Sequence, residues 1–340
     1  MTAKAQVSEI ADHASLQAKP LVSVLTLAYR HEKFLSEAIE GILAQRCDFP
    51  FELVIAEDCS PDGTLAIAME YQRRRPELVR VITADKNVGA YANSRRGVAA
   101  TRGKYVAFCE GDDYWQHPRK LQMQVEAMTA SNVTLCHTEY DRKAGPRLKR
   151  NQHASRRTPY LAQGNAYESL LYGWSVMTAT AMYRRDILED FYSTPFNNPR
   201  WPFGDYNKAL YASVRGQVAY LPISTATWRK VAGSASNADL AAMLRMRLAS
   251  LECRETFIAH YPVSEDVRTR SLANANRIVM KYAFYAGNMA AYETACGNLA
   301  ELGCPPPRLQ DLLMRAGMHT KFPVRAVDLM RRLQLRFFAN

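Results

Sequence analysis

No segment of this 340-residue sequence is apolar for long enough to span a bilayer, which takes about 18 to 20 residues. The first twenty residues carry acidic and polar side chains where a secretory signal would need an apolar core. Cysteine is scarce too. The seven cysteines are scattered and none stands in a Cys-x-x-Cys pair, which argues against a disulfide framework and a zinc knuckle. We therefore expect a cytoplasmic protein that is neither exported nor threaded through a membrane.

Acidic residues are in the minority. The sequence holds 44 lysines and arginines against 33 aspartates and glutamates, which gives a formal net charge of +11. This charge is compatible with an acidic partner, such as nucleotide phosphates, nucleic acid or an anionic membrane surface. It is also compatible with a basic protein that its charge keeps in solution. The charge alone does not choose between these interpretations.

Two hydrophobic periods alternate along the first part of the chain. The run LVSVLTL at 21–27 is typical of a buried strand, and apolar side chains between 34 and 43 then fall on one helical face. The same unit recurs, with strands predicted at 51–56, 78–82 and 104–109 and helices at 64–75, 93–101 and from Pro118 onward. Four strands with helices between them predict an α/β fold with a doubly wound, mostly parallel sheet and flanking helices.

The rest of the chain changes character twice. A polar, basic stretch at 141–158 is expected to be mobile, and a second pass of helix, strand, helix and strand follows it. Beyond Gly233 the composition shifts to alanine, leucine, methionine and arginine at helical spacing. We predict an N-terminal tail at 1–19, the α/β domain at 20–235 and a helical C-terminal region at 236–340.

The segments that follow the four strands direct the search for function, because open α/β sheets bind ligands beyond the carboxyl ends of their strands. All four segments are rich in polar or charged residues; they span 28–31, 57–64, 84–89 and 110–115. Polar loops are common elsewhere, so the joint position of these four is the informative signal.

Three carboxylates, those of Glu110, Asp112 and Asp113, follow the fourth strand directly. They would repel one another at one strand end unless a cation offsets their charge. Their oxygen atoms suit Mg²⁺ or Mn²⁺, which commonly takes one or two protein carboxylates and fills its other positions with water and diphosphate oxygens. The alternative is a solvated acidic turn that caps the next helix.

Two further strand ends offer groups that suit a nucleotide. Glu57 and Asp58 can accept hydrogen bonds from a base N–H and a ribose hydroxyl, although the following Ser-Pro-Asp-Gly turn also makes sense as a simple connection to a helix. Asn87 supplies a donor beside the flexible Gly89, and an ordinary turn is the alternative there.

Asp205 lies between aromatic residues and a predicted helix at 207–214. As the N-cap of that helix it would need no further explanation. As a carboxylate beside an apolar wall it is also a reasonable general base for an acceptor hydroxyl. The spacing leaves both interpretations open.

The ordered blocks VSVLTLAYRHEKFL, ELVIAEDCSPDGT, KNVGA, GKYVAFCEGDDYW and GDYNKAL resemble those of family 2 inverting glycosyltransferases with the GT-A fold. The resemblance covers residues 20–235 and extends to enzymes of bacterial surface-polysaccharide assembly. It implies a metal at Asp112 and Asp113 and a catalytic base at Asp205. It also implies that the donor nucleotide and its diphosphate contact Ala28, Tyr29, Glu57, Asp58, Asn87, Glu110, Asp112 and Arg229.

The chain departs from the family pattern at three places. Leu27 to Arg30 reads Leu-Ala-Tyr-Arg where Pro-Thr-Tyr-Asn is usual, Glu110 replaces the first aspartate of the metal block, and Gly204 replaces the glutamate that often precedes the base. Trp228-Arg229 fits the family's aromatic-arginine pair, whose arginine could hold a diphosphate with two hydrogen bonds. A surface arginine is the alternative for Arg229.

The resemblance implies a metal-dependent transferase that uses Mn²⁺ or Mg²⁺ and a nucleotide-sugar donor, with a UDP-sugar favoured. The acceptor would be a saccharide or lipid-linked saccharide in polysaccharide or lipid-linked glycan assembly, and it is expected to contact 174–185. Residues 321–340 alternate basic and apolar side chains, which would suit a helix lying on the inner face of an anionic membrane. A helix docked on the enzyme explains that pattern as well.

Two other classes of protein fit parts of the sequence. A nucleotidyltransferase would also use carboxylates and a metal on a similar sheet, but no glycine-rich phosphate loop follows Leu27. A nucleic-acid-binding protein would explain the net charge and the arginines at 142–157, but the expected stripe of aromatic and basic residues is missing. We therefore expect no nucleic acid partner.

Overall fold

The computed structural model describes residues 6–307, except 157, 159 and 232–238, together with 311, 312, 314, 315 and 318. The chain divides into two compact units. The first, here called the sheet unit, comprises Met1–Pro199 and Phe203–Ser234, and the second, the helical unit, comprises Arg200–Pro202 and Ala235–Asn340. Each unit is described by itself below.

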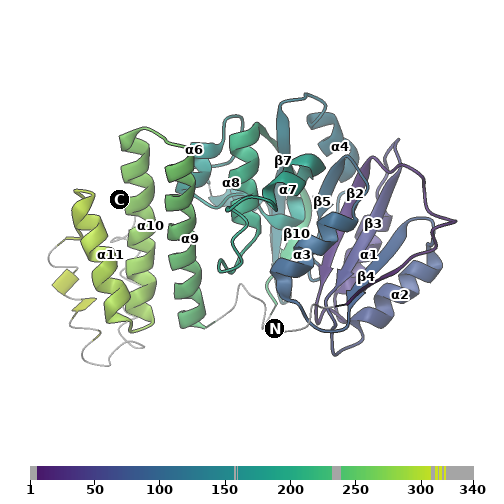
Figure 1. The fold of residues 1–340 in the computed structure, drawn as a ribbon, viewed down its shortest axis with the longest axis horizontal. Helices are drawn as coiled ribbons and strands as arrows, with labels where there is room; N and C mark the ends of the chain where they lie inside the picture. The colour runs from purple at the N-terminus through teal and green to yellow at the C-terminus, as the bar shows by residue number, and fades with distance from the viewer. Residues whose placement is uncertain are drawn as a thin grey trace. The chain divides into compact units, whose positions relative to one another are not determined.

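The first half of the sheet unit alternates strands and helices as the sequence predicts (Figure 1). The strands β2, β3, β4 and β5 pair in parallel, in the order β4, β3, β2, β5. The fold class, an α/β fold with a mostly parallel sheet and flanking helices, is confirmed. The elements are β2 (Val22–Ala28), α1 (Leu35–Leu43), β3 (Phe51–Glu57), α2 (Thr64–Arg74), β4 (Val79–Ala84), α3 (Gly89–Ala100), β5 (Tyr105–Phe108) and α4 (Lys120–Ala127).

The strand order determines which helix covers which face of this sheet. From β2 to β4 the chain moves steadily toward one edge, and it then returns across β3 and β2 to place β5. Because crossovers between parallel strands are right-handed, α1 and α2 lie on one face and α3 lies on the other, as Figure 1 shows. The direction of winding therefore reverses between β2 and β5.

The helix α1 illustrates why these segments fold as they do. Its side chains at Leu35, Ala38, Ile39 and Ile42 recur every three or four residues, and all four are fully buried. Burial of a leucine or isoleucine side chain stabilises a fold by about 1.5 to 3 kcal/mol. Gly41 lies on the same helix where a Cβ atom would come within 2.5 Å of the Trp115 carbonyl oxygen, so glycine allows the close approach of α1 to the strand β6 (Tyr114–Trp115).

Ten strands of the described residues form one sheet, in the order β1, β4, β3, β2, β5, β9, β7, β10, β6, with β8 paired to β7. The strand β9 runs antiparallel to both β5 and β7, whereas β7 and β10 are parallel to each other. The remaining elements are β1 (Val7–Ile10), β6 (Tyr114–Trp115), β7 (Val133–Ala144), β8 (Arg147–Lys149), α5 (Gln152–Arg156), α6 (Tyr167–Tyr172), the 3₁₀ helix η1 (Thr178–Thr180), β9 (Met182–Arg184), α7 (Arg185–Phe191), α8 (Asp205–Arg215) and β10 (Gln217–Arg229).

Two sequence expectations need correction here. Residues 7–10 of the expected N-terminal tail form the edge strand β1, where the Glu9 carboxylate pairs with the buried Arg80 at 2.7 Å. The stretch 141–158, expected to be mobile, instead contains the end of β7, then β8 and α5. The buried Glu139 carboxylate accepts hydrogen bonds from the backbone N–H groups at the start of α5, at 2.8 and 2.9 Å, and so holds this helix against β7.

A buried histidine on β7 predicts a pH dependence of stability. Burial lowers the pKa of His137 from 6.5 to about 4, and its Nε2–H donates to the Ala162 carbonyl at 2.7 Å. Between these two pKa values the unfolded chain binds more protons than the folded chain, so stability falls as the pH falls from about 6.5 to 4.

The variant His137→Phe should weaken this pH dependence. It removes the bond to Ala162 and is expected to be less stable than the wild type at pH 7, by about 1 kcal/mol. Because phenylalanine does not titrate, the variant should lose less additional stability on going from pH 7 to pH 4.5. Urea unfolding at both pH values measures the difference. Equal losses in both proteins would show that the acid sensitivity arises elsewhere.

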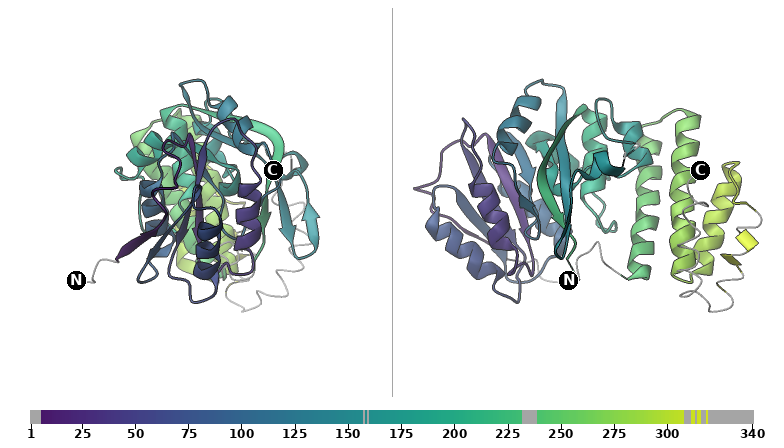
Figure 2. Two further views of the ribbon diagram at one scale, coloured as in Figure 1. Left: turned by 90° about the vertical axis from the view of Figure 1, so that its right-hand side faces the viewer. Right: turned by 180° about the vertical axis from the view of Figure 1, so that it is seen from behind.

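The helical unit contains α9 (Leu240–His260), α10 (Glu265–Tyr285) and α11 (Met289–Glu301). The helix α10 contacts both α9 and α11, and the three lie side by side in Figure 1 and in the right view of Figure 2. Each helix begins at a polar N-cap whose side chain accepts a backbone N–H, namely Asp239, Ser264 and Asn288. The predicted helical character of this region is confirmed. Among the described residues, no helix is both long and apolar enough to cross a membrane, and the segment 321–340 lies outside them.

Candidate active site

The carboxyl ends of β2, β3, β4 and β5 meet at one edge of the sheet, as parallel strands require. Backbone hydrogen bonds join the loops there: Asp58 N–H donates to the Ala28 carbonyl at 3.0 Å, and Gly111 N–H donates to the Leu27 carbonyl at 3.0 Å. The winding reverses between β2 and β5, and ligands of open α/β sheets bind at such a point. The segments after β2 and β5 are therefore the centre of the candidate site.

The acidic pair after β3 holds the neighbouring loops. The Glu57 carboxylate is fully buried and accepts the N–H groups of Cys59 and Ser60, at 3.1 and 2.6 Å. The Asp58 carboxylate accepts the N–H groups of Val88 and Gly89, each at 2.9 Å. Both carboxylates thus shape the predicted nucleotide loops, and direct contact of either with a nucleotide stays a prediction.

The predicted nucleotide residues Ala28, Tyr29 and Asn87 lie at the same edge. Ala28 is buried at the end of β2, the Tyr29 side chain is partly exposed, and the Asn87 side-chain amide donates to the Asp58 carbonyl at 3.2 Å. Two loop residues beside them have left-handed backbone, Arg30 with φ of 59° and Cys59 with φ of 54°. Non-glycine residues rarely adopt this conformation, and such strain often occurs at functional sites.

The two aspartates of the acidic turn after β5 differ in burial and in the partners of their carboxylates. Asp113 is buried, and its Oδ1 accepts the Arg229 backbone N–H at 2.8 Å. Asp112 is partly exposed, and the nearest ion-pair partner of its Oδ1 is Nε2 of His31 at 4.0 Å. Asp112 is therefore the better placed of the two predicted metal ligands to accept a further partner.

Arg229 supports this turn from β10. Its guanidinium donates to the Asp112 carbonyl at 3.1 Å, pairs with Glu37 of α1, and lies over the rings of Phe34 and Tyr114. The residue is buried, with 6% of its surface exposed, so the alternative of a surface arginine is wrong. In this arrangement Arg229 holds the turn in place, and a direct contact with a diphosphate stays a prediction.

Negative charge accumulates between the acidic turn and α8. Burial, together with the nearby carboxylates of Asp112 and Asp205, raises the pKa of Glu110 to about 8. Burial raises the pKa of Asp205 as well, whereas the Lys208 ammonium opposes that rise. Glu110 thus lies within electrostatic reach of Asp112 on its own loop and of Asp205 on α8. The structure brings together carboxylates that are far apart in the sequence.

These residues fit a divalent cation of the predicted kind. The carboxylate repulsion at Glu110 is what a cation would relieve, and the Asp112 side chain is partly exposed. Among the described residues no three histidine, cysteine, aspartate or glutamate side chains are grouped closely enough to hold a metal by themselves. Mg²⁺ commonly uses one or two protein carboxylates and takes its other ligands from water and phosphate, so this arrangement is compatible with it.

Asp205 is the first residue of α8, and the capping interpretation does not hold. The N-cap position is Gly204, and no side-chain hydrogen bond caps this helix. Instead the Asp205 Oδ2 accepts the Trp174 indole N–H and the Thr178 hydroxyl, both at 3.2 Å, while its Oδ1 accepts the Tyr206 N–H at 3.0 Å. A partly exposed carboxylate held in this way is chemically suited to accept a proton.

Three residues of the site were not predicted from the sequence. Burial lowers the pKa of His31, and its ring reaches from the loop after β2 to the loop after β5, where Nε2 lies 4.0 Å from Oδ1 of Asp112. Lys208 is buried three residues after Asp205, and its ammonium contacts the Ser94 hydroxyl at 3.2 Å and the Phe108 ring. That spacing places Lys208 one helical turn from Asp205 and was a readable signal. Thr178 lies within the stretch 174–185 that the acceptor is expected to contact, but nothing in the sequence distinguished it from its neighbours.

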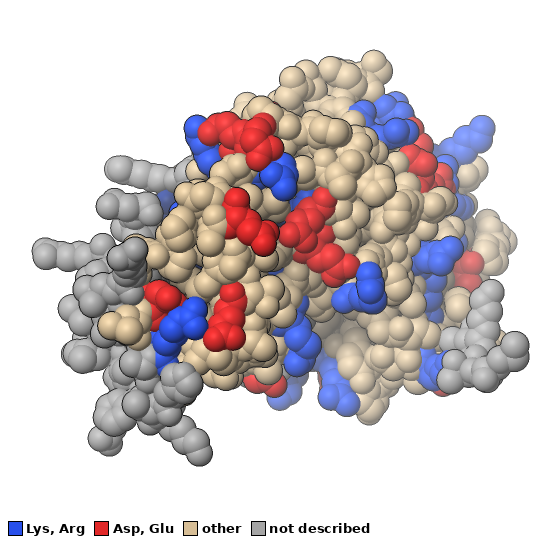
Figure 3. Space-filling model, turned by 60° about the vertical axis from the view of Figure 1, so that its left-hand side comes forward, with Lys and Arg blue, Asp and Glu red and all other residues tan. Residues whose placement is uncertain are grey.

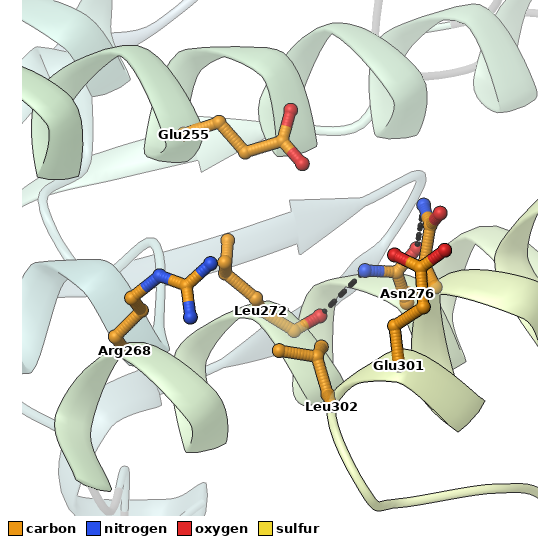
Figure 4. Close-up of a pocket in the computed structure, with 7 residues that line it drawn as sticks. Glu255, Arg268, Leu272, Asn276, Glu301 and Leu302 are labelled. Carbon is orange, nitrogen blue, oxygen red and sulfur yellow. Dashed lines mark hydrogen bonds between the residues drawn. The ribbon is translucent and has the colours of Figure 1, made fainter. Parts of the chain in front are cut away.

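The helical unit contains a hollow of its own, with a volume of about 350 Å³ (Figure 4). Most of its polar groups bind one another: the Asn276 amide donates to the Leu272 carbonyl at 2.9 Å, Asn298 donates to Asn276 at 3.0 Å, and Arg268 pairs with Glu265. None of the other side chains that line the hollow would act as a nucleophile or a general base together with its carboxylates. We assign no chemistry to this hollow, which is lined by Glu255, Arg268, Leu272, Asn276, Asn298, Glu301 and Leu302.

Comparison with known proteins identifies relatives of this chain. The family model described as Glycosyl transferase family 2 matches residues 23–192, half of the chain. An uncharacterized protein of Mycobacterium tuberculosis, Rv1520, is 42% identical over 116 residues, which are 34% of this chain and 34% of that protein. TuaG of Bacillus subtilis, a candidate teichuronic acid biosynthesis glycosyltransferase, is 32% identical over 144 residues, 42% of this chain and 56% of TuaG. The match thus spans about a third of the length of the first curated relatives.

Two solved structures are similar in fold. TarS 1-349 of S. aureus in complex with UDP-GlcNAc has a TM-score of 0.60 and 19% sequence identity, covering 84% of this chain and 81% of that one. The mannosyltransferase PcManGT from Pyrobaculum calidifontis, in complex with GDP-Man and Mn²⁺, has a TM-score of 0.55 and 15% identity, covering 92% and 84%. At such low identities these likenesses show a shared fold and no more.

Proposed function

The chain belongs to glycosyl transferase family 2, and from that membership we propose that it moves a sugar from a nucleoside-diphosphate sugar to an acceptor hydroxyl with inversion. The observation that carries the proposal is that Glu110, at the edge where the parallel strands end, lies within electrostatic reach of Asp112 and of Asp205 on α8. One of these carboxylates, Asp205, is partly exposed and held by donors from outside its own helix.

The proposed donor is a nucleotide sugar, with a UDP-sugar favoured. Two proteins of similar fold bind such donors, TarS with UDP-GlcNAc and PcManGT with GDP-Man. In this chain the loops after β2, β3 and β4, which Glu57, Asp58 and Asn87 hold in place, would receive the nucleotide. The family's role for Ala28 and Tyr29 as nucleotide contacts is part of the same proposal.

The proposed cofactor is Mn²⁺ or Mg²⁺, held by Asp112 and by oxygen atoms of the donor diphosphate. PcManGT binds Mn²⁺. When bound, the cation would neutralise the charge that gathers on the leaving diphosphate. The Asp113 carboxylate, which the Arg229 backbone N–H occupies, would position the turn that carries Asp112.

In the proposed reaction the acceptor oxygen attacks the anomeric carbon of the donor sugar. The bond from that carbon to the diphosphate oxygen breaks, and its electron pair leaves with the nucleoside diphosphate. Asp205 accepts the proton of the acceptor hydroxyl, so proton and charge are balanced. Burial raises the pKa of Asp205, and the positive charge of Lys208, one helical turn away, opposes that rise and so favours the ionised form that this role needs.

The acceptor proposed is a saccharide or lipid-linked saccharide in polysaccharide assembly, as the name of TuaG supports. Peripheral contact with an anionic membrane through residues 321–340 stays a prediction, since they lie outside the described residues. A cytoplasmic location is a prediction as well. On the face drawn in Figure 3, lysine and arginine side chains lie in small groups among aspartates and glutamates, a mixed pattern unlike the basic stripe of a nucleic-acid surface.

A thermal-shift screen tests the donor. Because a ligand that binds only the folded state stabilises it by mass action, a donor at 100 times its Kd should add about 2.7 kcal/mol and raise Tm by several degrees. We expect a larger rise with Mn²⁺ than with EDTA for one of UDP-GlcNAc, UDP-glucose and GDP-mannose. Release of the nucleoside diphosphate, rather than of pyrophosphate, then separates sugar transfer from nucleotidyl transfer. No shift with any nucleotide sugar would contradict the proposal.

A further inference from the structure

An aromatic wall stands beside Asp205. The Trp174 indole stacks on the Tyr206 ring, with centroids 5.0 Å apart and an angle of 24°, and Phe203 meets the same indole nearly edge-on at 5.1 Å. Tyr206 covers one face of the indole, yet Trp174 remains partly exposed. The indole edge that carries the N–H lies against the Asp205 carboxylate, so this partly exposed side chain adjoins the proposed base.

The two oxygen atoms of Asp205 are not equivalent. Oδ2 accepts two side-chain donors, the Trp174 indole N–H and the Thr178 hydroxyl, each at 3.2 Å. Oδ1 accepts one donor, the backbone N–H of Tyr206, at 3.0 Å. A carboxylate oxygen has two lone pairs, so Oδ2 is filled while Oδ1 keeps one lone pair for a further donor.

We propose that Trp174 forms the acceptor subsite of this enzyme: its N–H fixes Oδ2 of Asp205, which directs the acceptor hydroxyl to Oδ1, and its partly exposed side chain supports the apolar face of an acceptor sugar ring. This inference rests on the proposed function. Trp174 is a positioning residue with respect to the base, because it acts on proton transfer through Asp205.

The chemistry of the wall selects the class of acceptor. A pyranose ring presents C–H groups on its face and hydroxyls at its rim, so a ring lying on the indole brings a rim hydroxyl toward the neighbouring carboxylate. An acyclic polyol has no such face. The transferred proton passes from that hydroxyl to Oδ1 as the oxygen bonds to the anomeric carbon and the nucleoside diphosphate leaves with the electron pair.

Other titratable groups lie within electrostatic reach of Asp205. Lys208 lies on the same helix, Glu110 comes from the end of β5, and the buried Tyr183 comes from β9. Burial disfavours the ionised carboxylate of Asp205, whereas Lys208 favours it. Any titration seen at Trp174 therefore has to be assigned to Asp205 by mutation.

Fluorescence tests the contact without any substrate. The fluorescence of Trp174 is the difference between the emission of the wild type and that of Trp174→Phe. This difference should change with pH, because protonation of Asp205 alters the group that the indole N–H contacts. That titration should disappear in Asp205→Asn and persist in Trp228→Phe, which removes a tryptophan on β10. Persistence of the titration in Asp205→Asn would overturn the assignment. This result does not depend on sugar transfer, so it separates the inference from the proposed function.

Kinetics test the ring platform, with the donor selected by thermal shift and two acceptor probes, a p-nitrophenyl glycoside and glycerol. Trp174→Ala should raise KM for the glycoside by about tenfold, an effect of the size expected for one aromatic contact, while KM for the donor and KM for glycerol change little. Trp174→Phe keeps a ring and should leave KM for the glycoside within about twofold. Because both variants lose the indole N–H, both should lower kcat with either acceptor and move the acid limb of the pH profile. An equal rise in KM for glycoside and glycerol in Trp174→Ala would overturn the platform.

Discussion

Replacement of Asp205 by asparagine is expected to lower kcat by about 10² to 10⁴-fold while donor binding is kept. Asparagine has nearly the same shape, and its carbonyl oxygen can still accept the Tyr206 N–H or the Trp174 indole N–H. It cannot take up the acceptor proton. The Tm rise that donor and Mn²⁺ produce should therefore match that of the wild type, while sugar transfer, measured as release of nucleoside diphosphate, is almost lost.

The matched control for this variant is Asp186→Asn on α7. Asp186 is largely exposed and pairs with Arg184, so its loss should change neither transfer nor donor binding. Near-normal turnover of Asp205→Asn would show that another group accepts the proton. A variant that has lost both transfer and the donor-dependent rise in Tm would instead point to a structural role for Asp205.

The second large effect separates the two neighbouring aspartates of the acidic turn. Asp112→Asn should lower kcat/KM by about 10²-fold or more and abolish the difference in donor-dependent Tm between Mn²⁺ and EDTA. The reason is that the Asp112 side chain is partly exposed, whereas Asp113 is buried and its Oδ1 accepts the Arg229 N–H at 2.8 Å.

Asp113→Asn is the comparison. Burial and the charges of Asp112 and Glu110 raise the pKa of Asp113, so a neutral amide should be tolerated, and its oxygen can still accept the Arg229 N–H. We expect this variant to keep the Mn²⁺ dependence of donor binding and most of its activity. Equal loss of Mn²⁺ dependence in both variants would mean that both carboxylates hold the metal.

The architecture of the candidate site could largely be predicted from the sequence. Strands of period two and helices of period 3.6 are local patterns, and in the first part of the sheet unit they located the elements to within a few residues. Once the strands are parallel, their carboxyl ends must meet at one edge, so the joint position of Glu57, Asp58 and Glu110 follows from that pattern.

The strand β7 shows where local patterns fail. Most of it is buried, yet it carries polar side chains at Thr134, His137, Thr138 and Glu139. The Thr138 hydroxyl bonds to Thr225 on β10 at 2.7 Å, and Glu139 binds the start of α5. A polar group is tolerated in the interior when a distant segment satisfies it, and no alternation of apolar residues marks such a strand. The ordered stretch after β7 was missed for the same reason.

By itself the sequence determined the α/β class, the positions of the first four parallel strands and helices, and the acidic residues at the strand ends, because short-range periodicity and turn chemistry encode all of these. Only the tertiary structure decided which carboxylates already have hydrogen-bond donors. Asp113 accepts the backbone N–H of Arg229, which is 116 residues away in the sequence, and Asp205 accepts the indole N–H of Trp174, which is 31 residues away in the sequence. The direction of a side chain depends on which remote donor reaches it, and that donor is set by how the strands and helices pack.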